Sequence, residues 1–318
     1  VDLLEASGYY TGFTGKGVDP FQYARNDQDT LWRKGNAAGH PFNKYKYEKN
    51  ISSDLRTAKG IGLTNYYENF RSFMQQRKDG QPFYFWYGAT EPHRVYEKGS
   101  WKRNGKSLDQ VDVPGFLPDS EEVRGDMLDY AVEIEWADSH LSKMLEYLDS
   151  IGELNNTIVI VTADNGMPFP RAKANCFEYG VHVPFAVSYP KGFPGKRRVD
   201  DPISFVDIAP TILEIAGVKP DGMLPISGRS FMNILKSKKE GIVDQSKKYV
   251  YMGRERHSSS RWQNLGYPQR AVRNQDYLLI WNLRPERWPA GAPQMLNKKT
   301  GELCPMYGIG EDGTFHPD

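Results

Sequence analysis

The feature that most constrains the fold is a long helical pattern between two short apolar runs. Residues 82–89 form an aromatic run and residues 157–161 a β-branched one, whereas residues 118–152 have helical spacing. The apolar positions of that helix are Met127, Ala131, Ile134, Ala137, Leu141, Leu145 and Leu148. Asp119 and Glu122 have the spacing of a capping box at its start. Strand, long helix and strand in this order indicate a parallel α/β sheet.

The rest of the chain contains further predicted strands and a helix. Residues 183–190 predict another buried strand, and residues 204–218 predict a short helix that ends at Gly217. After about residue 245 the chain changes to strand-like segments with turn residues between them. We therefore expect an α/β fold with a mostly parallel central sheet flanked by helices, and a smaller C-terminal antiparallel subdomain. The predicted domains are residues 1–235 and 236–318.

Composition narrows the class of protein. The chain has 318 residues, of which 39% are apolar and 25% charged, so it can bury a sizeable core. Its net charge is +1, which argues against a nucleic-acid partner. No apolar stretch approaches the roughly 20 residues of a membrane-spanning helix. The two cysteines, Cys176 and Cys304, form neither a disulfide framework nor a metal-binding pattern.

Two oxygen-bearing side chains follow the strand at residues 157–161. Asp164 and Asn165 come where that strand ends, and ligands bind at the carboxyl edge of open α/β sheets. A carboxylate and an amide carbonyl suit calcium or magnesium better than zinc. The alternative is a simple Asx-turn that caps the strand. Lys173, a few residues later, is by itself an exposed loop lysine.

A glycine-rich stretch near the start of the chain carries another lysine. In "SGYYTGFTGKG", residues 7–17, Lys16 is placed where it could meet an anion. The stretch is not a phosphate-binding loop of the G-x-x-x-x-G-K-[ST] type, because Gly17 follows the lysine. An anion site and a flexible glycine loop both remain open. His93 follows the strand at residues 82–89 and is either a catalytic or an ordinary loop histidine.

Taken in order, these motifs resemble one family. The pattern G-Y-x-T-x-x-x-G-K at residues 8–16 is followed by "EPHR", the long helix, "DNGMPFPRAK", "GVHVP" and "YPQRAVRNQDYLLIWN". This order resembles the type I sulfatases of the alkaline-phosphatase-like superfamily over essentially the whole chain. Within that family it is most similar to the heparan N-sulfatase (sulfamidase)-like enzymes and their bacterial homologues.

The resemblance implies a sulfatase that hydrolyses a sulfuric ester or sulfamate of a sulfated glycan, such as a glycosaminoglycan fragment. In the family a formylglycine is the nucleophile and a calcium ion neutralises the sulfate oxygens. By position, Lys16 and Lys173 match sulfate-binding lysines, and His93 matches the histidine that binds sulfate or protonates the leaving group. Asp164 and Asn165 match calcium ligands. The family also implies a periplasmic or secreted protein, or a lysosomal one in animals.

The chain departs from the family pattern in several places. The formylglycine motif C/S-x-P-S-R and the early Asp-Asp calcium pair are both absent, and we expect them upstream of this chain. Val18 stands where many sulfatases have a histidine, and His182 where the related segment has an arginine. On the sugar side, the C-terminal subdomain of such enzymes helps to line the pocket. The predicted substrate-binding residues are His182, Arg254, His257 and Arg261.

Two other functions remain as alternatives. The first is a phosphatase or phosphodiesterase of the same superfamily, in which a histidine usually follows the strand-end aspartate to hold zinc. Asn165 at that position favours calcium and sulfate. The second is a catalytically inactive glycan-binding relative, which the missing nucleophile motif would fit. The sequence does not predict an oligomeric state.

Overall fold

The computed structural model describes residues 1–18, 35–48, 57–256, 266–287, 294–296 and 303–305. The chain forms two compact units that alternate along the sequence. The first unit comprises residues 1–157 and 206–232, and the second comprises residues 158–205 and 233–318. The predicted boundary near residue 235 between a catalytic domain and a C-terminal subdomain stays a prediction.

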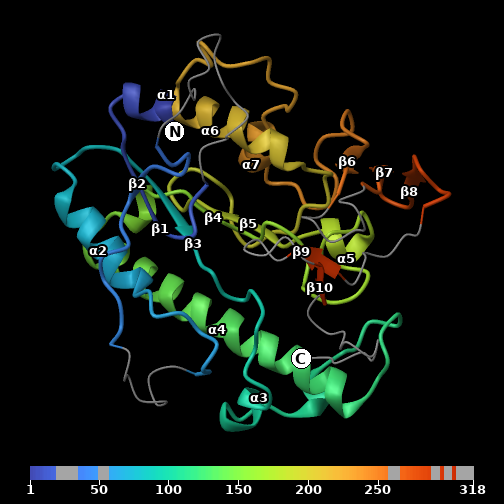
Figure 1. The fold of residues 1–318 in the computed structure, drawn as a ribbon. Coiled ribbons are helices and arrows are strands. Elements are labelled where there is room, and N and C mark those ends of the chain that lie inside the picture. Colours follow the sequence, from blue (N-terminus) through green and yellow to red (C-terminus); the bar gives the residue numbers. More distant parts are fainter. Residues whose placement is uncertain (19–34, 49–56, 257–265, 288–293, 297–302, 306–318) are drawn as a thin grey trace. The chain divides into compact units, whose positions relative to one another are not determined.

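A three-stranded parallel sheet lies at the centre of the first unit (Figure 1). β1 (Tyr10–Gly15) is the middle strand, with β2 (His40–Pro41) on one side and β3 (Phe83–Gly88) on the other. Both neighbours run parallel to β1. β1 is buried from Thr11 to Thr14, because elements cover both of its faces. The parallel α/β architecture expected from the sequence is therefore present.

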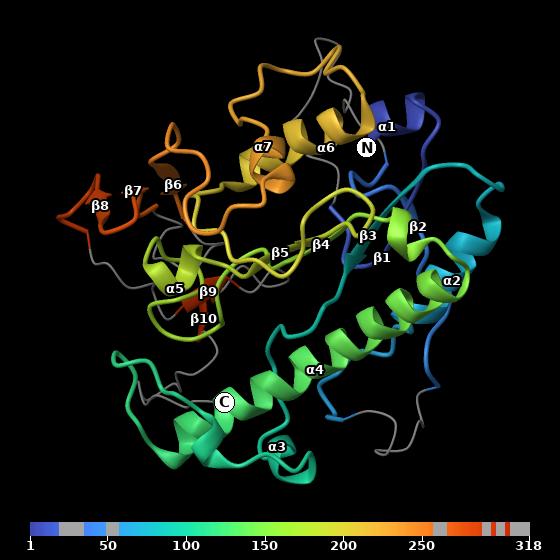
Figure 2. The ribbon, with the colours of Figure 1, turned by 180° about the vertical axis from the view of Figure 1, so that it is seen from behind.

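Helices cover this sheet. The described helices of the first unit are α1 (Asp2–Ala6), α2 (Tyr66–Gln76), α3 (Ser100–Arg103), α4 (Glu121–Ser150) and α6 (Ile208–Ala216). Short 3₁₀ turns lie at η1 (Leu108–Gln110), η2 (Leu154–Asn156) and η3 (Phe205–Asp207, which begins at the last residue of the second unit's first segment). Both ribbon views show α2 and α4 on one side of β1 and β3 (Figures 1 and 2). Phe70 and Phe73 of α2 pack with Met144 and Leu148 of α4 in one core cluster. No helix in the described ranges is long and apolar enough to cross a membrane.

The buried face of α4 differs from the predicted one. Its buried residues are Gly125, Leu128, Asp129, Val132, Glu133, Trp136, His140, Met144 and Leu148. Only Leu148 belongs to the predicted stripe, and Ile134 is 41% exposed. The predicted capping box is also wrong, because Ser120 is the N-cap and its side chain accepts from the Val123 amide. Asp119 instead forms an ion pair with Arg124.

Three ionisable side chains lie on this buried face. Asp129 accepts hydrogen bonds from the Gly99 and Trp101 amides and from the Ser100 hydroxyl. Glu133 makes no such bond at its buried Oε1, and burial, with Glu91 and Asp129 nearby, raises its pKa to about 8. Burial also lowers the pKa of His140 to about 4. The ring of His140 is therefore neutral at pH 7, and its Nδ1 accepts from the Tyr67 amide at 3.2 Å.

The carboxyl ends of β1 and β3 approach each other more closely than side chains permit. Gly15 and Gly88 are register partners. A Cβ on Gly15 would lie 2.1 Å from the Gly88 carbonyl oxygen, and a Cβ on Gly88 would lie 1.8 Å from the Lys16 carbonyl oxygen. Gly15 also has a φ of +78°, a left-handed conformation that favours glycine. Two glycines are thus required where the chain leaves the sheet toward Lys16.

The second unit is built from antiparallel pairs. β4 (Val159–Thr162) pairs with β5 (Phe185–Ser188), with α5 (Glu178–Val181) between them in sequence. Its remaining elements are α7 (Met232–Lys236, which begins at the last residue of the first unit), β6 (Val250–Arg254), β7 (Gln269–Arg273), β8 (Leu278–Asn282), β9 (Gln294–Leu296) and β10 (Leu303–Pro305). β6, β7 and β8 form the expected C-terminal antiparallel sheet. The expectation that the strand at residues 157–161 belongs to the parallel sheet is wrong, because β4 pairs antiparallel with β5 in a two-stranded ribbon and Val161 is 42% exposed. The strand expected to be buried at residues 183–190 is also only half-buried, since exposed residues alternate with half-buried ones along β5.

Replacing Gly88 tests the close approach of β1 and β3. Gly88→Ala should destabilise the fold by about 1–3 kcal/mol or more, because its Cβ would meet backbone atoms rather than a movable side chain. Gly115→Ala is the matched control, since nothing lies within 4 Å of its Cβ position. Urea unfolding of both variants checks the effect. Equal midpoints for the two variants would contradict it.

The raised pKa of Glu133 predicts a pH-dependent stability. Its folded-state pKa of about 8 lies above the ordinary value of 4.5 expected in the unfolded chain, so its contribution to stability is fully present below pH 4.5 and is lost as pH rises toward 8. Glu133→Gln should therefore gain stability over the wild type by up to about 1.4 kcal/mol per pH unit across that window. Urea unfolding between pH 5 and 9 measures this difference. Glu146→Gln, on the exposed side of α4, should show no such trend.

Candidate active site

Lys16 follows directly after β1, at the carboxyl edge of the parallel sheet. Its amide donates to the Gly88 carbonyl at 2.6 Å, and its carbonyl accepts from Trp86 Nε1 at 3.1 Å. Before it, the Gly15 amide donates to Asn43 Oδ1 at 2.7 Å. The backbone of Lys16 is thus fixed on both sides, whereas its side chain is exposed and has no hydrogen-bond or ion-pair partner among the described residues. Such a lysine is available to an anion.

His93 lies on the loop that follows β3, the strand next to β1. Glu91 anchors the start of this loop, because its carboxylate accepts from the Gly62 amide at 2.8 Å and from the Tyr66 hydroxyl at 2.6 Å. Arg94 anchors its other side through two hydrogen bonds to Asp126 on α4, at 3.0 and 2.5 Å. The loop is therefore held by residues on both sides of His93, and the histidine itself is exposed.

The ring orientation of His93 leaves one nitrogen available. Its Nδ1 lies 2.7 Å from the Arg94 carbonyl oxygen. A carbonyl only accepts hydrogen bonds, so Nδ1 carries the proton and Nε2 is the nitrogen that can gain or release one. Lys16 and His93 follow the carboxyl ends of two adjacent parallel strands, the edge at which α/β sheets bind ligands.

Asp164 and Asn165 lie in the turn after β4, in the second unit. Asp164 is exposed, and its carboxylate bonds to no residue in the described ranges. Asn165 Nδ2 donates to the Gly166 carbonyl at 2.9 Å, which leaves its Oδ1 free to accept. The Gly166 amide donates to the Gly180 carbonyl at 3.1 Å, and a Cβ on Gly166 would lie 1.7 Å from the Tyr179 carbonyl oxygen. The backbone of this turn therefore packs directly against the backbone of α5.

Asp164 and Asn165 offer the type of ligand atom that calcium prefers. A carboxylate and an amide oxygen are hard ligands, and calcium takes six to eight such oxygens in proteins. Asp164 and Asn165 thus supply part of a coordination shell. In the part of the chain that the structure describes, no three His, Cys, Asp or Glu side chains are grouped to hold a metal. The remaining ligands of such a site would have to be other oxygens.

Lys173 lies on a compact loop between Asn165 and α5. Its amide donates to the Met167 carbonyl at 3.0 Å, and its carbonyl accepts from Asn175 Nδ2 at 3.1 Å. Ala172 and Cys176 on either side are buried at 0% and 3% exposure. The Lys173 side chain is half-buried and has no partner within the described segments. Its backbone is therefore fixed while its ammonium group is available.

Four ionisable side chains lie on or beside this loop: two arginines, one histidine and one glutamate. The sequence predicted only two of the four. Arg254, predicted to bind substrate, donates to the Ala174 carbonyl and to Asn175 Oδ1 at 3.2 Å. His182, also predicted to bind substrate, bonds through Nδ1 to Glu178 Oε1 at 2.7 Å. Glu178 and Arg273 were missed, because nothing in the sequence indicates that residues so far apart form an ion pair.

The predicted residues thus form two groups, one in each compact unit. Lys16 and His93 lie at the carboxyl edge of the first unit's sheet. Asp164, Asn165, Lys173, His182 and Arg254 lie in or beside the loop of the second unit. His257 and Arg261 lie outside the described residues.

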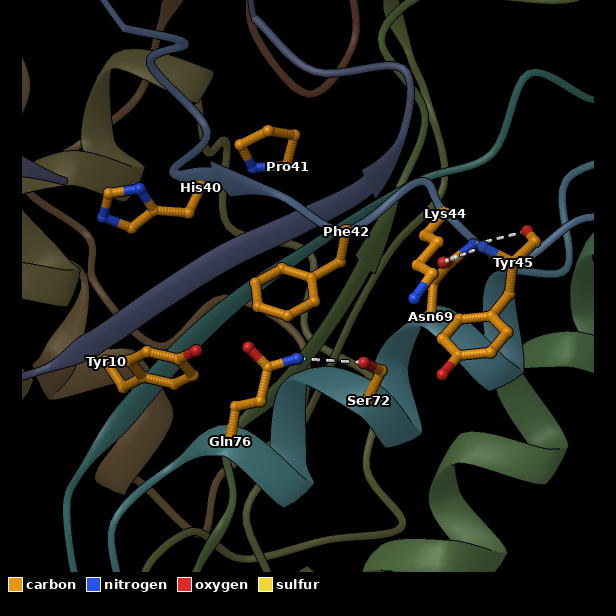
Figure 3. Close-up of a pocket in the computed structure, with 9 residues that line it drawn as sticks. All are labelled: Tyr10, His40, Pro41, Phe42, Lys44, Tyr45, Asn69, Ser72 and Gln76. Carbon is orange, nitrogen blue, oxygen red and sulfur yellow. Dashed lines mark hydrogen bonds between the residues drawn. The ribbon is translucent and has the colours of Figure 1, made fainter.

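A cavity in the first unit contains none of the predicted residues. It has a volume of about 360 Å³ and lies between the segment around β2 and α2, with Tyr10, Phe42 and Lys44 among its lining (Figure 3). Several polar groups in its wall are already engaged with each other. Gln76 donates to Ser72 at 3.0 Å, and Asn69 binds the Tyr45 backbone at 2.8 and 3.0 Å. We therefore do not place the active site there.

Comparison with known proteins identifies relatives of this chain. A human protein named N-sulphoglucosamine sulphohydrolase is 26% identical over 313 residues, which cover 88% of this chain and 56% of the relative. An ulvan-active sulfatase from Formosa agariphila is 26% identical over 249 residues, 67% of this chain and 39% of the relative. The chain spans about half the length of these curated relatives.

A solved structure shows the same fold. It is described as a complex with its substrate D-glucosamine-2-N,6-O-disulfate, and it superposes with a TM-score of 0.62 at 16% identity. The superposition covers 89% of this chain and 72% of that one. Residues 172–289 match the family profile described as N-sulphoglucosamine sulphohydrolase, C-terminal. Residues 1–218 match the sulfatase profile, and because this match covers more than half of the 318 residues, the chain belongs to the sulfatase family.

Proposed function

We propose that this chain forms the larger part of the active site of a calcium-dependent sulfatase that acts on a sulfated glycan. The observation that carries the proposal is the loop after β4. This one loop carries the side-chain oxygens of Asp164 and Asn165 and the ammonium group of Lys173. No other described residue forms a hydrogen bond or ion pair with these oxygens or with this ammonium group. A metal and a cation on the same loop suit an oxyanion such as sulfate.

The chain's own residues have distinct roles in this proposal. Asp164 and Asn165 hold the calcium ion, which when bound draws negative charge from the sulfate oxygens. Lys16 and Lys173 are, by their place in the family motifs, sulfate-binding lysines. His93, with Nδ1 fixed on the Arg94 carbonyl, holds a proton at Nε2 for the oxygen or nitrogen of the leaving sugar.

The nucleophile comes from outside this sequence in our proposal. Neither Cys176, in "KANCFEYG", nor Cys304, in "ELCPMY", has the context C/S-x-P-S-R that formylglycine formation requires in the family. Cys176 is also buried, and burial raises the pKa of its thiol. The relatives are about twice as long as the part of them that this chain spans, which leaves room for the motif.

The relatives support a sulfated amino sugar or a related acidic glycan as substrate. The human relative is named for N-sulphoglucosamine, and the solved structure holds a glucosamine that carries both an N-sulfate and an O-sulfate. We therefore propose a sulfuric ester or sulfamate of a glycosaminoglycan fragment. The family resemblance also supports a periplasmic, secreted or lysosomal protein.

Replacing Asp164 tests the calcium site. Asp164→Ala should weaken calcium binding by more than the ~10–100-fold typical of outer-shell changes, because it removes a ligand. Calorimetric titration with calcium measures this affinity. Asp221→Ala, at another exposed aspartate, should bind calcium as the wild type does. An unchanged affinity in Asp164→Ala would remove Asp164 from the ligand set.

Replacing Lys173 or His93 tests the catalytic roles. In the full-length protein, which supplies the nucleophile, either alanine variant should slow sulfate release from D-glucosamine-2-N,6-O-disulfate by about 10²–10⁴-fold. Stability should change little, because the described residues make no bond to the Lys173 side chain and His93 is exposed. Lys219→Ala, at an exposed lysine elsewhere, is the control. Full activity in Lys173→Ala or His93→Ala would return that residue to an ordinary loop position.

A further inference from the structure

We propose that Arg254 and Arg273, on adjacent strands of the C-terminal sheet, are positioning residues that fix the two functional parts of the loop after β4. Arg254 acts on the backbone of Lys173, and Arg273 acts on the turn that carries Asp164 and Asn165. The roles of the positioned residues rest on the proposed function, whereas the positioning itself is a property of the fold.

The first arm of the proposal is the chain of hydrogen bonds that connects Arg254 to the backbone of Lys173. Arg254, the last residue of β6, donates to the Ala174 carbonyl and to Asn175 Oδ1. Asn175 uses its other side-chain atom, Nδ2, to donate to the Lys173 carbonyl at 3.1 Å. The amide group of Asn175 is therefore a bridge with one partner on each side. Because that bridge ends on the Lys173 backbone, the arginine determines where the lysine side chain starts.

The local backbone requires such support. Ala174 has a φ of +63° and Arg171 a φ of +61°, the left-handed region that non-glycine residues seldom adopt. A conformation of this kind persists only where surrounding contacts hold it. The Arg254 guanidinium bonds directly to the carbonyl of Ala174. The bond comes from a charged donor, and such bonds are stronger than those between neutral groups.

The second arm runs from Arg273 to the Asp164–Asn165 turn. Arg273, the last residue of β7, forms two parallel hydrogen bonds to Glu178, both of 2.8 Å. This pair, with His182 also bonded to Glu178, holds the pKa of the Glu178 carboxyl below its usual range. Glu178 is the first residue of α5, and the Gly180 carbonyl in the same helix accepts from the Gly166 amide.

Close backbone packing transmits the position of α5 to the loop. A Cβ on Gly180 would lie 2.4 Å from the carbonyl oxygens of both Ala172 and Asn175, so α5 lies directly against the Lys173 segment. Gly166 meets the Tyr179 carbonyl in the same way. With no side chains between these backbones, a shift of α5 has to move the turn as well.

Hydrogen–deuterium exchange of the full-length protein tests the positioning directly. Arg254→Ala should raise the exchange rate of the Lys173 and Asn175 amides by about tenfold or more, because their local opening becomes easier. Arg273→Ala should do the same for the Gly166 and His182 amides. Arg284→Ala is the matched control, since it removes an exposed ion pair just beyond β8. Exchange in these amides no faster than in Arg284→Ala would overturn the proposal.

Kinetics of sulfate release separate positioning from direct contact with the glycan. If Arg254 acts through Lys173, the double variant Arg254→Ala/Lys173→Ala should be no slower than Lys173→Ala alone. Arg254→Lys, which keeps the charge and one donor, should recover part of the loss. Fully additive losses would show that Arg254 acts elsewhere and would overturn its assignment.

Calcium affinity tests the second arm, the connection from Arg273 to the Asp164–Asn165 turn. Arg273→Ala should weaken calcium binding, whereas Arg254→Ala should leave it nearly unchanged. Calcium affinity equal to the wild type in Arg273→Ala would overturn that arm. If exchange responds as expected but Lys173→Ala retains full sulfate release, the positioning stands and the proposed function fails.

Discussion

Close approach of backbone to backbone, at positions where only glycine fits, is the constraint on which the candidate site depends. Gly15 and Gly88 let β1 and β3 meet at their carboxyl ends, and Gly166 and Gly180 let the loop after β4 lie against α5. At both places the functional side chain is one to several residues away from the contact. The backbone is fixed at these points by close contacts, and the side chains of Lys16 and Lys173 have no hydrogen-bond or ion-pair partner among the described residues.

This arrangement separates the groups that hold the fold from the groups that meet a substrate. Glu91, Arg94 and Asp126 hold the loop around His93, whereas the His93 ring bonds through Nδ1 to the Arg94 carbonyl and its Nε2 has no hydrogen-bond partner among the described residues. Likewise, hydrogen bonds of the loop after β4 are made by its backbone and by the amide groups of Asn165 and Asn175, whereas the Asp164 carboxylate makes none among the described residues. Exposed, unengaged charges close to rigid backbone are the elements that electrostatic catalysis needs.

The ionisable groups on the buried face of α4 differ from those of the candidate site, because they are buried and do not meet a substrate. Asp129 remains compatible with burial because three donors meet its carboxylate. Glu133 and His140 lack full sets of partners, so their pKa values shift toward the neutral form. Burial of His140 costs stability as pH falls from about 6.5 to 4, and burial of Glu133 costs stability as pH rises from about 4.5 to 8, so their combined contribution is greatest between about pH 4.5 and 6.5.

The sequence alone determined the order of elements, the helix end at Gly217, the C-terminal antiparallel sheet and the family, but not the antiparallel pairing of β4 with β5. These depend on local patterns: residue periodicity, glycine at helix ends and motifs in a fixed order. Tertiary structure decided which face of α4 is buried, because apolar residues at helical spacing occur both on the predicted stripe and on the observed face, where Leu128, Val132 and Trp136 lie beside polar residues. It also decided that Arg273 pairs with Glu178, 95 positions away. Such contacts depend on how strands are brought together, and that information is not local in the chain.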